Sequence, residues 1–175
     1  MSVTSPHARI LEAVKTQLAS LGLFRLIDEN HSQHMGDIPQ LTYPAVLVDI
    51  EDCNYEEAGE GSQFVTSELS FLVLQDNYSQ SSQKAPTSAK ERAHSVYELE
   101  ASVVGAIHGW APTAKIDGYD HQFTEPFIRV SSRKMDVDGK GLRCREIRFS
   151  TAWEETFDDA PKARPQISVE CCIIP

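Results

Sequence analysis

The clearest pattern of hydrophobic and polar positions lies on either side of residues 138–141, which read Asp-Gly-Lys-Gly. If this stretch closes a two-residue hairpin loop, one register sets apolar residues opposite one another along both arms. The same register places Arg133 opposite Glu146, two charges of opposite sign. The pattern therefore predicts a β-hairpin over about residues 127–153. Its predicted pairs are Ile128 with Thr151, Val130 with Phe149, Ser132 with Ile147, Met135 with Cys144 and Val137 with Leu142.

The base and the tip of this hairpin present apolar residues to opposite faces, because side chains alternate along a strand and the apolar positions change parity in both arms together. The apolar residues at the base are expected to face the chain's own core. Those near the tip need another cover. Three covers satisfy the pattern: the C-terminal tail of the same chain, a β-bulge that rotates the face back, or a neighbouring subunit.

The spacing of apolar residues also predicts two helices. The first begins with Ser5 as its cap and Pro6 at its first position, and it ends near Gly22. The second spans about residues 87–110 and has one acidic residue, Glu100, on its apolar face. The apolar positions are Ile10, Leu11, Val14, Leu18 and Leu21 in the first helix and Ala93, Val96, Tyr97, Val103, Val104 and Ile107 in the second.

Short apolar or alternating runs predict the remaining strands. We expect a long acidic turn over residues 51–61 and a polar segment over 76–90 that is mobile in the isolated protein. A last alternating run over 167–173 predicts an edge strand, either within the chain or donated to another molecule. The order of elements predicts an α+β fold, in which two main helices pack against a mostly antiparallel sheet of about four to five strands. The earlier predicted strands lie at 24–27, 43–50 and 64–73.

The length of 175 residues fits one domain, which we assign to residues 1–156, with 157–175 as a linker and the edge or donated strand. The hydrophobic content is 41%, without an apolar run of membrane-spanning length or a visible secretory signal, so we expect cytoplasmic folding and no membrane partner. The formal net charge is −10, which disfavours sequence-independent binding to nucleic acid.

The charges are unevenly spread along the chain. Basic residues gather on the predicted hairpin, and acidic residues gather on the predicted turn over 51–61. Two interpretations stay open: two solvated surfaces, or electrostatic docking of one copy on another. The basic residues are Arg129, Arg133, Lys134, Arg143, Arg145 and Arg148, and the acidic ones are Glu51, Asp52, Glu56, Glu57 and Glu60.

Candidate catalytic residues are confined to the connection between the second helix and the hairpin. Asp117, Asp120, His121 and Glu125 are near one another in sequence, but no nucleophile elbow, paired carboxylate motif or phosphate-binding glycine loop accompanies them. We therefore expect no enzymatic activity. The aromatic residues around this connection suit either core packing or interface anchoring. These residues are Trp110, Tyr119, Phe123 and Phe127. Trp153, on the hairpin, is expected in the core.

Metal-binding patterns are weak. His31 and His34 would share a metal only on a helix, with Asp28, Glu29 or Asp37 as further ligands, and this segment is expected to be a loop. We therefore expect no metal and no cofactor. The cysteines lack Cys-x-x-Cys spacing and are expected to be reduced thiols. They are Cys53, Cys144, Cys171 and Cys172.

The layout resembles that of tail terminator and tail completion proteins of long-tailed bacteriophages and prophages, including a Mu-like prophage family. A helix ends in Leu-Gly-Leu-Phe and leads to the strand sequence Tyr-Pro-Ala-Val-Leu-Val at 43–48. A long strand, the helix containing residues 90–100 and the late strand over 141–151 follow, so that the resemblance covers about residues 5–156.

The resemblance implies a small α+β subunit without catalytic residues. Such subunits form a ring, commonly of about six copies, at the head-proximal end of the tail, and they contact the tail tube and head–tail connector proteins. The protein would then assemble in the host cytoplasm and end in the virion. A small-molecule-binding or enzymatic domain built on residues 117–125, and a non-phage protein-interaction module, are the alternatives.

The hairpin and the polar segment supply the predicted contact residues. The predicted contacts between copies are Arg133, Met135, Val137, Leu142, Cys144 and Arg145, and the predicted contacts with the tube or another partner are Tyr78, Lys84 and Phe123.

Overall fold

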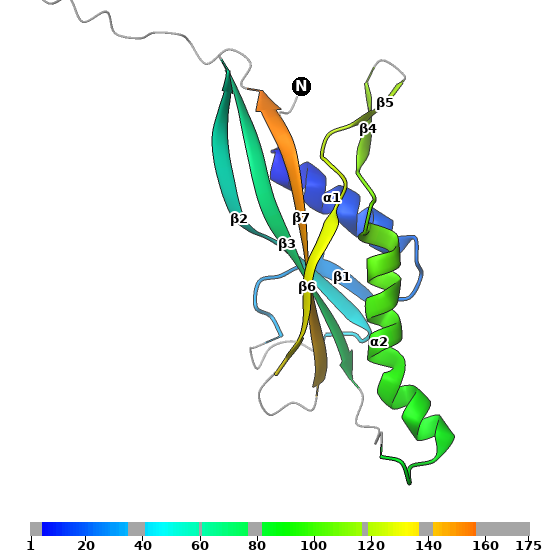
Figure 1. Ribbon diagram of the computed structural model, residues 1–175. Helices are drawn as coiled ribbons and strands as arrows, with labels where there is room; N and C mark the ends of the chain where they lie inside the picture. The colour runs from blue at the N-terminus through cyan, green and yellow to red at the C-terminus, as the bar shows by residue number, and fades with distance from the viewer. Residues whose placement is uncertain are drawn as a thin grey trace, which may run out of the picture.

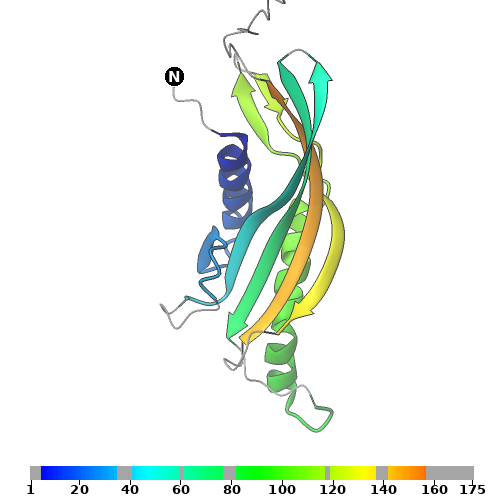
Figure 2. The ribbon, with the colours of Figure 1, turned by 90° about the vertical axis from the view of Figure 1, so that its left-hand side faces the viewer.

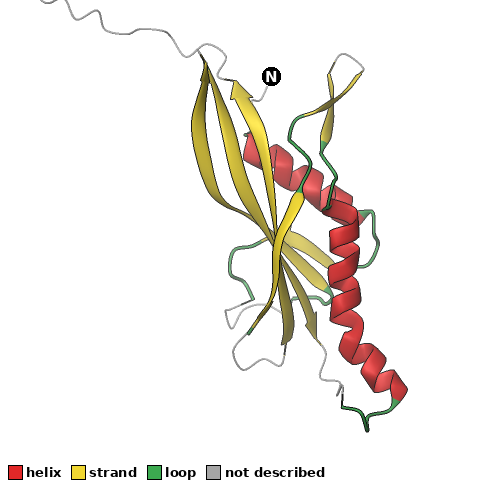
Figure 3. Ribbon diagram, in the orientation of Figure 1, coloured by secondary structure: helices red, strands yellow, loops and turns green. Residues whose placement is uncertain are grey.

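The computed structural model describes residues 5–34, 41–59, 61–76, 82–116, 119–136 and 142–156. Within these residues two helices pack against a five-stranded sheet, and a separate two-stranded hairpin completes the structure (Figures 1 and 3). The predicted α+β class is confirmed. The elements are α1 (Pro6–Ala19), β1 (Leu26–Glu29), β2 (Ala45–Gly59), β3 (Ser62–Asp76), α2 (Thr87–Ile107), β4 (Thr113–Ile116), β5 (Tyr119–Gln122), β6 (Ile128–Met135) and β7 (Leu142–Thr156).

The strand order of the large sheet is β1-β2-β3-β7-β6, and only β1 and β2 are parallel. Strands β2, β3 and β7 are each 15 residues long and form a curved, twisted centre (Figure 2). Strands β4 and β5 form the separate hairpin. The outer strands of the large sheet are therefore β1 and β6, and beyond the four residues that β1 covers, β2 itself forms the edge.

The acidic turn expected over residues 51–61 is wrong, because β2 continues as a strand to Gly59. The acidic half of β2 pairs with the first half of β3, which is equally long and pairs with β7 on its other side. The β2–β3 ladder satisfies the main-chain groups on one side of the acidic segment, and its polar side chains are mostly exposed, so they do not prevent strand formation. The turn lies at the end of this ladder, where Gly61 has a φ of +81°.

Both helices cover one face of the sheet, and this helix-covered face contains the main core. Alternate residues of β3 and β7 point into it, and Phe71 and Phe149 meet edge to face with ring centroids 5.1 Å apart. The predicted apolar positions of α1 from Ile10 to Leu18 are buried. The helix ends at Ala19, before the predicted Gly22, and the Ser5 side chain makes no cap hydrogen bond.

The predicted helix α2 is confirmed, but one predicted core residue is wrong. Tyr97 is 49% exposed, and Leu99 is buried instead. The face of α2 that packs on the sheet follows Val96, Leu99 and Val103, which leaves Tyr97 beside the guanidinium of Arg145, 5.6 Å from the ring centroid.

The predicted hairpin forms, although its register is confirmed only towards the tip. Ser132 pairs with Ile147, Arg133 with Glu146 and Met135 with Cys144. A β-bulge between Arg129 and Ser131 shifts the base by one residue, so that Ile128 pairs with Ser150 and not with Thr151. The expected pair of Val130 with Phe149 is therefore wrong, because Arg129 takes that place. The pair of Val137 with Leu142 includes a residue outside the described part.

Candidate functional site

The sheet face opposite the two helices, called here the open face, has an apolar end near the tip of the β6–β7 hairpin. Cys144 is buried there with four residues of β2 and β3, and Met135 packs against the same cluster. Leu26, Leu41 and Tyr43 are partly buried against it. On β7 the tip residue Cys144 thus lies on the opposite face from Phe149 and Trp153 at the base, as predicted, and the chain itself covers part of the tip set. On β6 the prediction is wrong, because Ile128 pairs with Ser150 and lines the open face. The four residues of β2 and β3 are Ala45, Leu47, Leu72 and Leu74.

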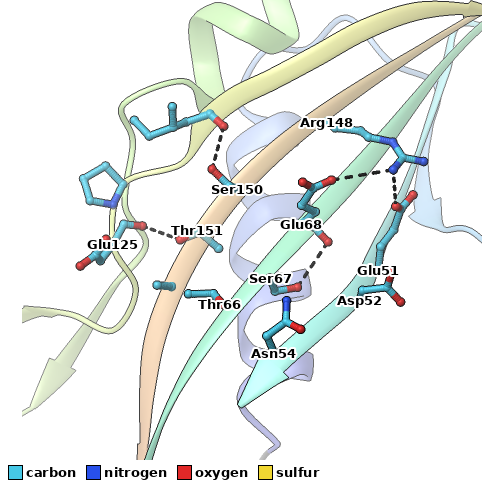
Figure 4. Close-up of a pocket in the computed structure, with 13 residues that line it drawn as sticks. Glu51, Asp52, Asn54, Thr66, Ser67, Glu68, Glu125, Arg148, Ser150 and Thr151 are labelled. Carbon is cyan, nitrogen blue, oxygen red and sulfur yellow. Dashed lines mark hydrogen bonds and ion pairs between the residues drawn. The ribbon is translucent and has the colours of Figure 1, made fainter. Parts of the chain in front are cut away.

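The middle of the open face has a charged cluster that crosses four strands. Arg148 of β7 lies 2.9 Å from Glu51 of β2 and 3.8 Å from Glu68 of β3, measured between nitrogen and oxygen (Figure 4). Its Nε atom is also 3.3 Å from an oxygen of Glu146, which pairs with Arg133 of β6 on the other side. We call these five residues the open-face charge cluster. Arg148 lies between the glutamates of β2 and β3 on one side and Glu146 on the other, and Arg133 pairs with Glu146 at the β6 edge.

Glu146 is the most enclosed member of this cluster, with a side chain only 6% exposed. Burial alone would raise the pKa of its carboxyl group, but hydrogen bonds from Arg133 and Arg148 outweigh burial and hold the pKa below its usual value. The Glu146 carboxylate therefore stays charged, and it holds the two arginine side chains in place.

Glu100, the acidic residue on the apolar face of α2, has a similar partner set on the helix-covered side. Its carboxylate accepts hydrogen bonds from Arg145 Nε, at 2.7 Å, and from Ser132 Oγ. Burial would raise its pKa, and these hydrogen bonds lower the pKa overall. The acidic residue thus joins α2 to β6 and β7.

A groove of about 520 Å³ lies beside the open-face charge cluster (Figure 4). Strands β2, β3 and β7 form its floor, and Glu125, Pro126 and Ile128 line one side. The Glu125 carbonyl accepts a hydrogen bond from Thr151 Oγ1 at 2.7 Å, which fixes that side to β7. Acidic and hydroxyl side chains dominate the lining, so the groove suits polar contact more than an apolar ligand.

Some of the residues predicted to join copies are already paired or buried within the chain, and others are partly accessible near the hairpin tip. Arg145 binds Glu100, Arg133 binds Glu146, and Cys144 is buried, so these three groups already have partners within the chain. Met135 and Leu142 are half-buried near the tip. Val137 lies outside the described residues. Contact of this tip with another copy remains a prediction.

The predicted tube contacts are separated in the structure. Lys84 is exposed in the loop before α2, whereas Tyr78 lies outside the described residues. Of the segment 76–90 that was expected to be mobile, residues 77–81 are outside the described part, and residues 87–90 belong to α2. Phe123 is half-buried against the main core, and the Arg9 guanidinium lies 4.7 Å from its ring centroid. A role of these residues in binding a partner remains a prediction.

Three of the other aromatic residues, Trp110, Phe127 and Trp153, pack in or against the main core. Phe127 is buried and stacks on the half-buried Trp110, with ring centroids 5.8 Å apart. Trp153 is 3% exposed, which confirms its predicted place in the core. Tyr119 is the first residue of β5.

The candidate acid/base residues are on different parts of the connection between α2 and β6. Asp120 and His121 are on β5, Glu125 lines the groove, and Asp117 lies outside the described residues. His31 is exposed and His34 is buried, and Asp37 is also outside the described part. Among the described residues no three His, Cys, Asp or Glu side chains are placed to hold a metal ion. In the same residues, neither helix is long and apolar enough to cross a membrane.

The two described cysteines are free thiols in different surroundings. Cys53 is half-buried on β2, with its sulfur 3.5 Å from His7 Nε2 and 3.3 Å from Ser67 Oγ. Cys144 is buried, and burial raises the pKa of its thiol to about 11. Cys171 and Cys172 lie outside the described residues.

Two features of the open face were missed at the level of sequence. The separation of acidic and basic residues along the chain disappears in part, because Arg148 contacts Glu51 within one molecule. Ile128 and Val130 were expected in the core, yet they are 50% and 53% exposed. The bulge causes this difference, and a glycine or proline that would indicate a bulge is absent from residues 127–135.

Comparison with family models and with curated proteins gave no match. Solved structures do match the fold. One is a chain of a structure described as "Virion of native gene transfer agent (GTA) particle", which is 14% identical, with a TM-score of 0.50. The match covers 87% of this chain and 100% of that chain. At this level of identity the likeness establishes a shared fold.

Proposed function

We propose that this protein is a structural, non-enzymatic subunit of a phage-like particle, and more specifically a tail terminator or tail completion subunit. The observation that carries the proposal is the shared fold with a chain of a gene transfer agent virion, over the whole of that chain and 87% of this one. The terminator role comes from the resemblance in the order of elements over residues 5–156. The partners would be further copies of the chain in a ring, the tail tube and the head–tail connector.

The described surface is suited to contact with proteins. The open-face charge cluster fixes a polar surface in one arrangement, and β6 leaves an exposed edge with two large apolar side chains beside it. Assembly would take place in the host cytoplasm, and the finished subunit would be part of the particle.

A ligand-binding domain is a second candidate, and the groove on the open face is the observation that favours it. Its volume of about 520 Å³ is within the range of small-molecule sites, whereas its acidic and polar lining is not typical of them. A small-molecule library would distinguish the two functions, because a ligand that binds the folded state raises the melting temperature, with the logarithm of its concentration once this exceeds Kd.

Negative-stain electron microscopy of the purified protein tests the structural proposal directly. We expect closed rings of one size. A field of single compact particles, together with a melting temperature that rises with a small molecule, would contradict the proposal and support the ligand-binding function.

A further inference from the structure

Strand β6 is an open edge of the large sheet. It pairs with β7 on one side, and seven of its eight residues are exposed. Contacts with α2 are limited in the described residues: the Arg129 main-chain N–H donates to His108 Nδ1 at 3.2 Å, and Ser132 Oγ donates to Glu100. An edge of this kind can accept another strand.

The side chains of β6 indicate which chemistry would fit. Ile128 and Val130 are half exposed near its start, and the basic residue Arg129 lies between them. The other two basic residues of β6 already have acidic partners in the chain, since Arg133 pairs with Glu146 and Lys134 with Asp136. A partner strand with apolar residues would cover Ile128 and Val130, and a negative charge on it would suit Arg129.

The last nine residues of the sequence have this composition. Ile167, Val169, Cys171 and Ile173 alternate with other residues, and Glu170 lies at their centre. The described chain ends at Thr156, so this run is attached through ten residues, 157–166. We infer that residues 167–174 of one copy bind β6 of a second copy as an added antiparallel strand. The inference rests on the proposed function, because it names the contact that joins neighbours in the ring.

The geometry favours the tail of a second copy, and not the tail of the same molecule, as the strand that pairs with β6. An antiparallel strand beside β6 must begin near Met135, which lies opposite Cys144 on β7. The stretch of β7 from Cys144 to Thr156 is about 41 Å long. Thr156 and Ile167 are eleven Cα–Cα steps apart, which span about 40 Å at most when fully extended. In its own molecule the tail would have to run almost fully extended back along β7 and across to the outer side of β6, whereas a neighbouring molecule can supply it without this constraint in the better hydrogen-bonded antiparallel direction.

Other strands of a second copy fit less well. Two β6 strands side by side would bring the Arg129 side chains of both copies near further basic residues, and β6 has no acidic residue of its own to offset them. Strand β1 has only four residues, and local side chains already bind its end: Gln33 Nε2 donates to the Glu29 carbonyl at 2.7 Å, and Asp28 accepts from the Glu29 N–H at 2.9 Å.

Disulfide cross-linking in the full-length chain tests this inference. Val130→Cys and Ser131→Cys each place one thiol at the exposed start of β6, where the native Cys171 and Cys172 of the tail would lie within reach. Ala101→Cys, exposed on α2, is the matched control. After mild oxidation we expect a several-fold higher yield of covalent dimers and larger species from the β6 variants. Peptide mapping should identify bonds between residue 130 or 131 and a tail cysteine.

Three results would overturn the inference: a yield equal to that of Ala101→Cys, bonds that join only tail cysteines, or a monomer with an internal bond from β6 to its own tail. Light scattering on the same samples separates this failure from failure of the proposed function. Rings without the cross-link contradict only the donated strand, whereas single chains at all concentrations contradict both. Val169→Asp, which changes a residue outside the described fold, should also reduce the mass of the assembly without loss of the circular dichroism spectrum.

Discussion

The two faces of the large sheet have different compositions and different consequences. Adjacent residues of β7 illustrate this: Phe149 is fully buried under the helices, whereas Ser150 points to the groove on the open face. The helix-covered face gains its stability from apolar burial. The open face is apolar only near the hairpin tip, and its middle is occupied by the charge cluster around Glu146. One face therefore stabilises the fold, and the other is available for contact with partners.

The largest difference between the faces should appear on truncation of β7 side chains. Phe149→Ala leaves a cavity beside Phe71 and should lower the free energy of unfolding by about 3–5 kcal/mol. Ser150→Ala, its neighbour on the open face, should change it by less than about 0.5 kcal/mol. Urea unfolding followed by circular dichroism measures both. Equal losses would mean that the two faces contribute alike to stability, and they would contradict the claim that burial on the helix-covered face stabilises the fold.

A smaller effect should follow from removing the central charge of the open face. Glu146→Gln leaves Arg133 and Arg148 without their shared carboxylate, and we expect a loss of about 2 kcal/mol in the free energy of unfolding. Glu154→Gln, exposed farther along the same strand, is the matched control and should be close to neutral. If the two variants unfold at the same urea concentration, the open-face charge cluster does not stabilise the fold.

Acid should weaken the protein through the same charges. The pKa values of Glu100 and Glu146 are lowered in the folded state, so the unfolded chain binds more protons as the pH falls. Their contribution is fully present above about pH 4.5, the ordinary glutamate value, and is lost as the pH falls through the lowered pKa values. Asp49 acts in the opposite direction, because burial raises its pKa.

Urea midpoints between pH 7 and pH 3 measure this dependence. The double variant Glu100→Gln and Glu146→Gln should show a weaker dependence on pH than the natural chain. An unchanged slope would show that other carboxylates are responsible for the loss of stability in acid.

The smallest expected effect concerns thiol chemistry and leaves stability unchanged. At pH 8, a thiol with a pKa of about 11 forms roughly 100-fold less thiolate than one at the usual value near 9, and Cys144 is also only 2% exposed. Cys144 should therefore react only slowly with a disulfide reagent in the folded protein, and the half-buried Cys53, which the reagent can reach, should react much faster. Mass spectrometry of each labelled site measures the two rates. Similar rates would show that the apolar end of the open face opens readily to solvent.

Much of the helix-covered face could be predicted from the sequence, because local periodicity reports which side of an element is buried. Ile10 to Leu18 in α1 and Val96, Val103 and Ile107 in α2 are examples. The tip register of the β6–β7 hairpin was also correct, since it depends on a short loop between two apolar arms. Glu100 could be noticed as an exception, but its partner Arg145 is 45 residues away in the chain.

The open face could be predicted only in part, because its features depend on pairing between distant strands. The acidic end of β2 is a strand only because β3 satisfies its main chain, and composition alone indicated a turn. A one-residue bulge moved Ile128 and Val130 out of the expected core positions. The contact of Arg148 with Glu51 likewise requires the strand order of the folded sheet. The exposed edge and the charge cluster therefore became visible only in the structure.

The central claim is that this protein is a ring-forming structural subunit, and its mass in solution is the most direct test. Light scattering should be measured on the full-length chain across a wide range of concentrations. The account predicts one closed assembly, of about six copies as the resemblance to tail terminators implies, with a mass that does not rise further with concentration. A mass equal to that of a single chain at every concentration would contradict it.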